Sequence, residues 1–162
     1  MEKIIVDENN RSVLIEKAVR TNADMIYRIA YQQTGSFDDA EDILQEVSVA
    51  LVTKNAPLED EEYLRRWLIR VTVNKCRDLY RHKKRTHTES LEENINIPAK
   101  EKDEILDELF LLPEKYRTVL YLYYYEEFTL KEIAQTLNKS INTVSSELQR
   151  ARKKLRKILT EE

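Results

Sequence analysis

Glycine and proline constrain the fold of this chain most, because they are almost absent from it. The sequence holds one glycine and three prolines in 162 residues. Strand-rich folds need turn residues at short intervals, and glycine and proline supply many of them. The scarcity of both residues therefore predicts an all-α fold. The single glycine, Gly35, is predicted to end a helix in the left-handed conformation.

Apolar residues at helical spacing predict three helices in the first half of the chain. The first covers residues 12–31, and the second begins after Ser36, where Ser36 and Asp39 resemble a capping box. The third begins after the break at Pro57 and covers about residues 61–81. We assign residues 8–86 to a small helical domain built from these helices.

The second half predicts another small helical domain, at residues 104–162. Its predicted helical segments are residues 105–111, a helix opened by Pro113, residues 130–137 and residues 141–157. The tyrosine-rich run at 121–125 is expected to be helical, with some rings in the core and others at the surface. Residues 87–103 lose the helical period, contain Pro98 and are mostly polar, which predicts a flexible linker.

Charge is segregated along the chain, although the net charge is only -3. Acidic residues gather at 38–42, 58–62 and 89–94, and basic residues gather at 65–85 and 139–157. Two basic zones favour nucleic-acid binding, and the acidic remainder leaves a face for another partner. Cys76 is the one cysteine, so it forms no internal disulfide and favours a reducing cytoplasm. No leader-like start or membrane-length apolar run is evident in the sequence, which predicts a soluble protein.

Residues 128–155 have the spacing of a helix-turn-helix. Ala134 is small where two helices cross, and Asn138 tolerates a left-handed turn. In the last helix, polar residues lie opposite an apolar stripe, as in a helix that contacts base edges and phosphates. The candidate residues are Asn142, Thr143, Ser146, Gln149, Arg150 and Lys153. The alternative is an ordinary amphipathic surface helix with solvated charges.

A basic stripe runs along the predicted third helix. Its cations lie within about 60° of one another on a helical wheel, and Asn74 lies at the margin. The stripe suits a phosphate backbone. Trp67 lies on the apolar face of this helix, so we expect it to pack in the core rather than stack on a base. The candidate residues are Arg66, Arg70, Asn74, Arg77, Arg81 and Lys84.

The predicted second helix exposes an acidic face formed by Asp39, Asp42, Gln45 and Glu46. No histidine joins these carboxylates and hard-cation loops have different spacing, so no metal is expected. The face is either a solvated surface or a docking surface for a basic partner. The two histidines and the cysteine lack zinc-site spacing, and no catalytic set or phosphate-binding loop is evident. We therefore expect no catalytic residue, cofactor or small-molecule substrate.

Three motifs, in this order, resemble the extracytoplasmic-function (group IV) sigma factors of bacterial RNA polymerase, the smallest members of the sigma-70 family. "DDAEDILQEV" is similar to the part of sigma region 2 that docks on polymerase, and "WLIRVTVNKCRDLYRHKKR" to the part that handles the promoter -10 element. "LPEKYRTVLYLYYYEEFTLKEIAQTLNKSINTVSSELQRARKKL" is similar to sigma region 4. The resemblance implies a region 2 helical bundle and a region 4 helix-turn-helix joined by the linker.

The resemblance also implies partners and roles. The acidic face would dock on the beta-prime clamp helices of core RNA polymerase, and region 4 would meet the beta flap. The basic stripe with Asn74 would handle the opened -10 strand, and the last helix would read the -35 element in promoter duplex DNA. An anti-sigma factor, in this family often membrane-bound, would control the chain. A stand-alone helix-turn-helix regulator, which binds palindromes as a dimer, is the competing function.

Three residues depart from the family pattern. Ser48 stands where an aromatic residue is usual, and Ser145 and Glu147 stand where basic residues are common. The last two affect the expected -35 sequence and the strength of its binding. We expect Glu147 to lie beside the apolar face and to form an ion pair that orients Arg150.

Overall fold

The computed structural model describes residues 8–86 and 108–161, and their regular structure is helical. The first domain consists of α1 (Glu8–Thr34), α2 (Phe37–Thr53) and α3 (Glu61–Thr86). The three helices pack on one another around a core that includes Ile26, Val47 and Leu68. The predicted helices are confirmed, but α3 extends five residues beyond the predicted end at Arg81, to Thr86.

The junction between α1 and α2 has the predicted glycine helix end but only part of the predicted capping box. Gly35 has φ +66°, and its amide donates to the Tyr31 carbonyl at 2.7 Å, as expected for a helix-ending glycine. Ser36 Oγ accepts from the Asp39 amide at 3.3 Å. The Asp39 carboxylate contacts Lys83 on α3. Ser36 therefore caps α2 as predicted. The Asp39 carboxylate does not complete the capping box but instead connects α2 to α3.

The second domain consists of α5 (Glu114–Leu120), η1 (Tyr121–Tyr125), α6 (Leu130–Leu137) and α7 (Ile141–Thr160). Pro113 immediately precedes α5, at the N-cap and not at the predicted first helical position. The tyrosine-rich run η1 is a π-helix rather than an α-helix. Its first ring, Tyr121, is buried, whereas Tyr124 and Tyr125 are exposed, so the mixed placement of the rings is confirmed. Residues 105–107 of the predicted helix 105–111 lie outside the described residues.

The turn between α6 and α7 fixes the helix-turn-helix. A capping box formed by Thr129 and Glu132 begins α6. Asn138 ends it with φ 54° and ψ 49°, which confirms the predicted left-handed turn residue. Ser140 Oγ then accepts from the Thr143 amide at 3.1 Å and begins α7. Polar side chains thus satisfy free amide groups at the start of both helices.

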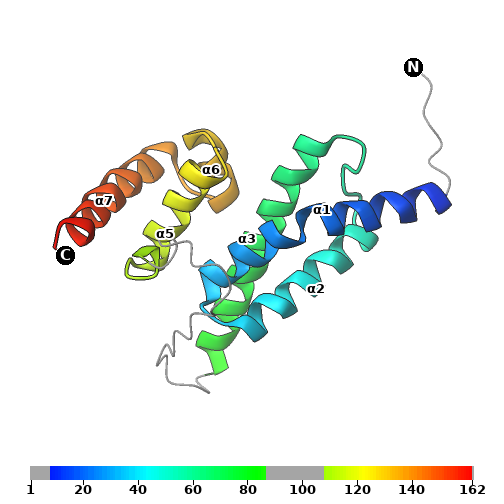
Figure 1. The fold of residues 1–162 in the computed structure, drawn as a ribbon, viewed down its shortest axis with the longest axis horizontal. Helices are drawn as coiled ribbons and strands as arrows, with labels where there is room; N and C mark the ends of the chain where they lie inside the picture. Colours follow the sequence, from blue (N-terminus) through cyan, green and yellow to red (C-terminus); the bar gives the residue numbers. More distant parts are fainter. Residues whose placement is uncertain (1–7, 87–107, 162) are drawn as a thin grey trace.

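The two domains pack against each other, which the sequence did not indicate. In Figure 1, α3 lies between α1 and α2 on one side and the second domain on the other. Helix α3 packs on α6 and α1 packs on α5. Ile29, Ile69 and Val73 of the first domain are at most 1% exposed and belong to the same buried cluster as the core of the second domain. The predicted linker 87–103 lies outside the described residues.

Candidate nucleic-acid interfaces

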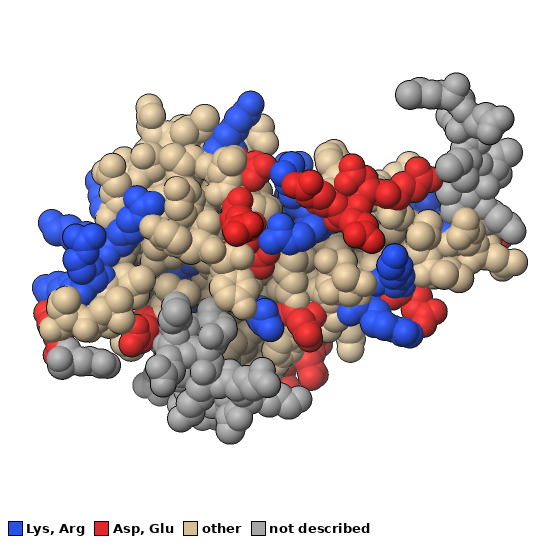
Figure 2. All heavy atoms as spheres, turned by 45° about the horizontal axis from the view of Figure 1, so that its top comes forward, with Lys and Arg blue, Asp and Glu red and all other residues tan. Residues whose placement is uncertain are grey.

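Helix α7 presents a continuous polar face. Its apolar side is buried through Val144, Leu148 and Ala151, which belong to the core of the second domain. The opposite side is exposed and carries Asn142, Ser146, Gln149, Arg150 and Lys153. Thr143 is also exposed, but its hydroxyl lies 2.8 Å from Ser140 Oγ at the helix cap. The structure therefore brings the six predicted residues to one helix and uses one of them in the cap. Figure 2 shows lysine and arginine side chains gathered at the α7 end of the molecule.

Glu147 lies beside the apolar face as predicted, but the predicted ion pair with Arg150 is wrong. Glu147 is only 8% exposed and accepts two hydrogen bonds from Lys139 Nζ, at 2.9 and 3.1 Å. Its partner is therefore in the turn before α7, not at Arg150 one turn further along the helix. Within the described part of the chain, no carboxylate lies within ion-pair distance of Arg150. Glu147 therefore adds no acidic charge to the outward face of α7, and the Arg150 guanidinium is available to a phosphate or a base.

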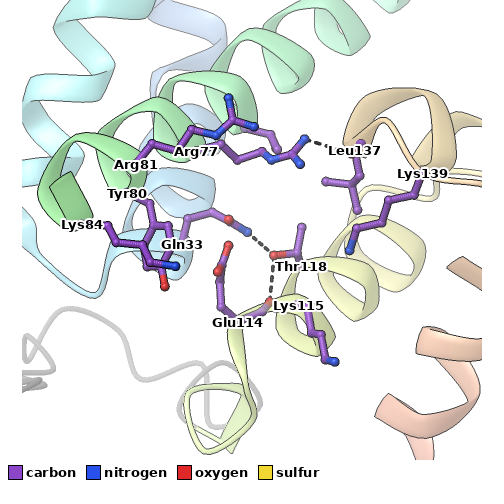
Figure 3. A pocket seen from close by; sticks show the side chains of 11 residues that line it. Gln33, Arg77, Tyr80, Arg81, Lys84, Glu114, Lys115, Thr118, Leu137 and Lys139 are labelled. Atoms are coloured by element: carbon purple, nitrogen blue, oxygen red, sulfur yellow. Dashed lines mark hydrogen bonds between the residues drawn. The ribbon is translucent and has the colours of Figure 1, made fainter. Parts of the chain in front are cut away.

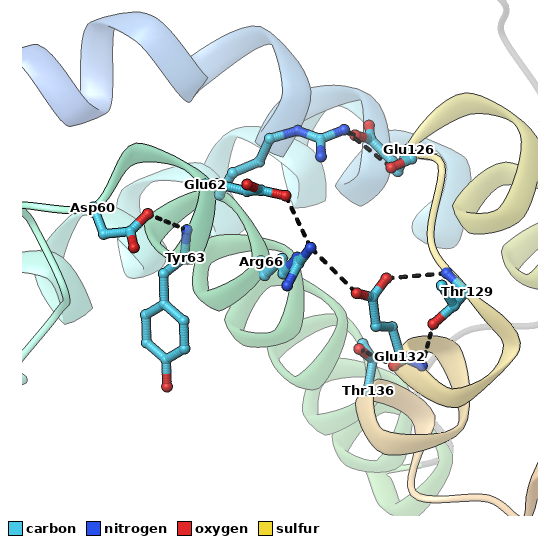
Figure 4. A network of polar contacts seen from close by, with 9 residues as sticks. Asp60, Glu62, Tyr63, Arg66, Glu126, Thr129, Glu132 and Thr136 are labelled. Carbon is cyan, nitrogen blue, oxygen red and sulfur yellow. Dashed lines mark hydrogen bonds and ion pairs between the residues drawn. The ribbon is translucent and has the colours of Figure 1, made fainter.

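The basic stripe of α3 is divided by the second domain. Arg70, Asn74, Arg81 and Lys84 are exposed. Arg66 Nη2 lies 2.9 Å from Glu62 Oε1 and 3.3 Å from Glu132 Oε1 in the second domain (Figure 4). Arg77 Nη1 donates to the Leu137 carbonyl at 2.9 Å (Figure 3). Five of the six predicted residues are thus exposed, including Arg66 despite its ion pairs, and only Arg77 is half-buried.

A basic cavity of about 320 Å³ lies where the stripe meets the second domain. Figure 3 shows side chains from both domains around it. Its cations are Arg77, Arg81 and Lys84 from α3 and Lys115 and Lys139 from the second domain, against one acid, Glu114. Tyr80, which is 52% exposed, also lines it. The sequence analysis missed Tyr80, although its spacing from Arg77 and Lys84 places it beside the stripe.

Trp67 packs where it was predicted. It is half-buried against the core of the first domain, so the core-packing interpretation is confirmed. Cys76 is buried as well, and burial is the main cause that raises the pKa of its thiol to about 12. The thiol is therefore protonated near neutral pH, where a nucleophile or a metal ligand would need the thiolate.

The acidic face of α2 is narrower than predicted. Asp42, Gln45 and Glu46 are exposed, and Glu46 Oε2 lies 3.9 Å from Lys75 Nζ. Asp39 is half-buried and held by Lys83. Val49 and Val52 follow on α2 and are 59% and 58% exposed. Sequence reasoning missed these two valines because apolar residues on a helix are normally assigned to its buried side.

Comparison with known proteins places these features in a family. Residues 18–86 match the family model for sigma-70 region 2, and residues 102–155 match that for sigma-70 region 4. The two helical domains and these two matches define a member of the sigma-70 class.

Individual relatives show which family within the sigma-70 class this chain belongs to. The chain is 30% identical to the ECF RNA polymerase sigma factor SigW of Bacillus subtilis, a match that spans 84% of this chain and 83% of SigW. It is 29% identical to the RNA polymerase sigma factor SigV of the same organism, over 92% of this chain and 93% of SigV. The chain belongs to the extracytoplasmic-function sigma factors.

Two solved structures share the fold. The sigma factor RpoE of Bartonella quintana, solved with the anti-sigma factor NepR, superposes with a TM-score of 0.70 at 20% identity. That match covers 90% of this chain and 96% of RpoE. CnrH, solved with the cytosolic domain of CnrY, superposes with a TM-score of 0.60 at 23% identity, over 93% of this chain and 97% of CnrH.

Membership of this family decides between the two competing functions, a sigma factor and a stand-alone helix-turn-helix regulator. Sigma factors are transcription-initiation factors that act with RNA polymerase and are not catalysts in themselves. The chain is therefore a sigma factor rather than a stand-alone helix-turn-helix regulator. None of the described helices has both the length and the apolar character that crossing a membrane requires.

Proposed function

We propose that this sigma factor directs core RNA polymerase to promoters through three surfaces on two domains, residues 8–86 and 104–162. The exposed polar face of α7 supports the first assignment, which is the reading of the -35 element in duplex DNA. Its amide and hydroxyl groups come first along the helix and its cations follow, as a recognition helix in the major groove requires. This face is the observation on which the proposal chiefly rests.

The α3 stripe is proposed to handle the opened -10 strand. Arg70, Arg81 and Lys84 are exposed cations with about helical spacing, and Asn74 is an exposed amide among them. Cations along a helix attract a phosphate backbone, and an amide can form paired hydrogen bonds with a base edge. Arg66 is exposed as well, although it contacts Glu132, and Arg77 is half-buried against the second domain.

The acidic face of α2 is proposed to dock on the beta-prime clamp helices, with Asp42, Gln45 and Glu46 at its centre. The second domain would meet the beta flap. An anti-sigma factor is the expected regulator of the two domains. On this proposal the chain performs no chemistry, takes no small-molecule substrate and works in the cytoplasm beside the polymerase.

The proposal is tested by mixing the purified chain with core RNA polymerase and separating the mixture by gel filtration at low salt. We expect the chain to elute with the polymerase as a stoichiometric complex and to start transcripts at a subset of promoters. If the chain elutes alone at its monomer position, docking on the polymerase is wrong. If the chain is a dimer that shifts duplex DNA without polymerase, the result would favour a stand-alone helix-turn-helix regulator.

Replacing Arg150 with Ala tests the α7 face. We expect weaker promoter use and a shallower dependence of binding on salt, by about one unit of slope, because one phosphate contact releases about 0.9 counterions. The measurement is holoenzyme binding to promoter DNA over a series of salt concentrations. Arg20→Ala is the matched control, since it removes one exposed arginine charge from α1. An Arg150→Ala slope equal to that of the Arg20→Ala chain would remove Arg150 from the interface.

A further inference from the structure

The basic cavity between the two domains carries cations on both of its walls. They are Arg77, Arg81 and Lys84 of α3, and Lys115 and Lys139 of the second domain. Among the described residues that line the cavity, Glu114 is the one acid, so positive charge is in excess. A cleft lined by charges of one sign focuses the electrostatic field and concentrates ions of the opposite sign. The cavity therefore favours an anionic ligand.

Hydrogen bonds and an ion pair fix the inner part of the cavity. Arg77 Nη1 donates to the last carbonyl of α6 at 2.9 Å, and Lys139 Nζ donates to both carboxylate oxygens of Glu147. Gln33 donates to Thr118 and so joins α1 to α5 beside the cavity (Figure 3). Arg77 and Lys139 are half-buried, and Glu147 balances the charge of Lys139. Groups that are fixed before a ligand arrives lower the entropy cost of binding it.

The other three cations of the cavity are open to solvent. Arg81, Lys84 and Lys115 are exposed, and none of them forms an ion pair with a carboxylate in the described part of the chain. Lys115 Nζ lies 5.0 Å from the centroid of the Tyr116 ring, a contact that leaves its charge unneutralised. These cations can therefore bind an anion without first losing a carboxylate partner.

An oligophosphate chain suits this set of groups. Guanidinium groups bind phosphate oxygens in pairs, and ammonium groups act as point charges. Adjacent phosphates carry several negative charges close together, so cations on both walls can be satisfied at once. The volume of about 320 Å³ lies at the small end of the range for ligand sites, about 300–1,000 Å³. A DNA strand that follows α3 would meet Arg81 and Lys84 without requiring Lys115 on the opposite wall.

We propose that this cavity binds an oligophosphate chain, either free or as the phosphate tail of a nucleotide. Arg77, Arg81 and Lys84 hold phosphate oxygens from the α3 side, and Lys115 holds them from the second domain. Glu114 opposes the charge of the ligand. The chain is bound as a ligand and not as a substrate, so the site goes beyond the proposed function, although it shares cations with the -10 surface.

Tyr80 distinguishes the two sources of the phosphate chain. Its ring lines the cavity and is 52% exposed. A base stacked on this ring adds a contact that a free chain lacks. If the ligand is a nucleotide, ATP should bind at least about fivefold more tightly than tripolyphosphate, and Tyr80→Ala should remove the difference. Equal affinities for the two compounds would assign the site to a free chain.

Isothermal titration calorimetry of the full-length chain with tripolyphosphate and with ATP tests the site, at constant ionic strength and without divalent cations. We expect saturable binding of both compounds and no binding of adenosine. Arg81→Gln and Lys115→Gln should each weaken binding by about tenfold, because each removes a charge-assisted contact from one wall. Arg156→Gln and Lys131→Gln are the matched controls, since each removes an exposed cation outside the cavity. These two should leave the affinity unchanged.

Glu114→Gln should change the affinity in the opposite direction. The carboxylate is exposed at the start of α5 and lines the cavity, so its removal takes away a charge that repels phosphate. We expect tripolyphosphate to bind about fivefold more tightly to this variant. A residue that only supported the fold would not produce a gain in affinity when replaced, so an unchanged or weaker affinity contradicts the assigned place of the ligand.

Two further results would overturn the site. The first is an absence of saturable binding, or losses at Arg81 and Lys115 no larger than those at Arg156 and Lys131, which would show only a general attraction of polyanions to basic surfaces. The second is a loss in Arg81→Gln alone, because the cations of α3 would then suffice, as they would for the phosphates of a DNA strand. Co-elution with core polymerase is measured without these compounds, so it tests the proposed function separately.

Discussion

A chain carrying Asp42→Lys and Glu46→Lys is expected to lose its complex with core RNA polymerase. Both carboxylates are exposed on α2, and Glu46 has only a distant contact, 3.9 Å, to Lys75. Truncating one member of a desolvated interfacial charge pair costs about 2–5 kcal/mol, and reversal adds repulsion. Two such losses should weaken docking by at least about a thousandfold. Gel filtration with core enzyme and promoter-dependent transcription measure the loss.

The fold should survive this change. Substitutions at exposed helix positions that form no cap or buried contact change the free energy of unfolding by about 0.5 kcal/mol or less. The thermal unfolding curve should therefore barely move. Glu16→Lys/Asp24→Lys is the matched control, because it makes the same change in net charge on the exposed side of α1. If the α2 variant transcribes as well as the α1 variant, the acidic face has no docking role.

Leu68→Ala should give a large loss of stability in the first domain. Leu68 is 0% exposed and packs in the core between the three helices. Truncating a buried leucine removes its transfer free energy and leaves a cavity, at a cost of about 2–5 kcal/mol. Native stabilities are about 5–15 kcal/mol, so this is a large share of the total. Urea unfolding followed by the fluorescence of Trp67, the single tryptophan, reports on this domain directly.

Leu159→Ala is the control for this substitution. Leu159 lies on α7 and is 50% exposed, so its truncation should change the free energy of unfolding by about 0.5 kcal/mol or less. Equal midpoints for the two variants would show that Leu68 does not support the core of the first domain in the way that its burial requires.

Features set by neighbouring residues could be predicted from the sequence. Gly35 and Asn138 have the left-handed conformation that their positions indicated, and α6 has the predicted bounds of residues 130–137. The burial of Val144 and Leu148 and the exposure of Asn142 follow from helical periodicity alone. Each of these features depends on residues within one or two turns, where spacing determines geometry.

Features that join distant residues could not be predicted. Arg65 and Glu126 are 61 residues apart, and no periodicity relates them. Lys139 and Glu147 are eight residues apart, but Lys139 lies in the turn that follows Asn138, outside the helix that contains Glu147. A helical wheel of α7 contains only residues of that helix, so the partner predicted from it, Arg150, was wrong. The roles of the DNA-contacting and docking residues stay predictions for the same reason, since their partners are other molecules.

The separation of the α7 face from the core has a consequence for how this protein can change over generations. Asn142, Ser146 and Gln149 are exposed, whereas Val144, Leu148 and Ala151 hold the helix in place. Substitutions at the exposed positions alter the groups offered to a base pair while costing little stability. Duplicated copies of such a gene can therefore diverge toward different sets of target promoters one residue at a time, without first acquiring compensating changes in the fold.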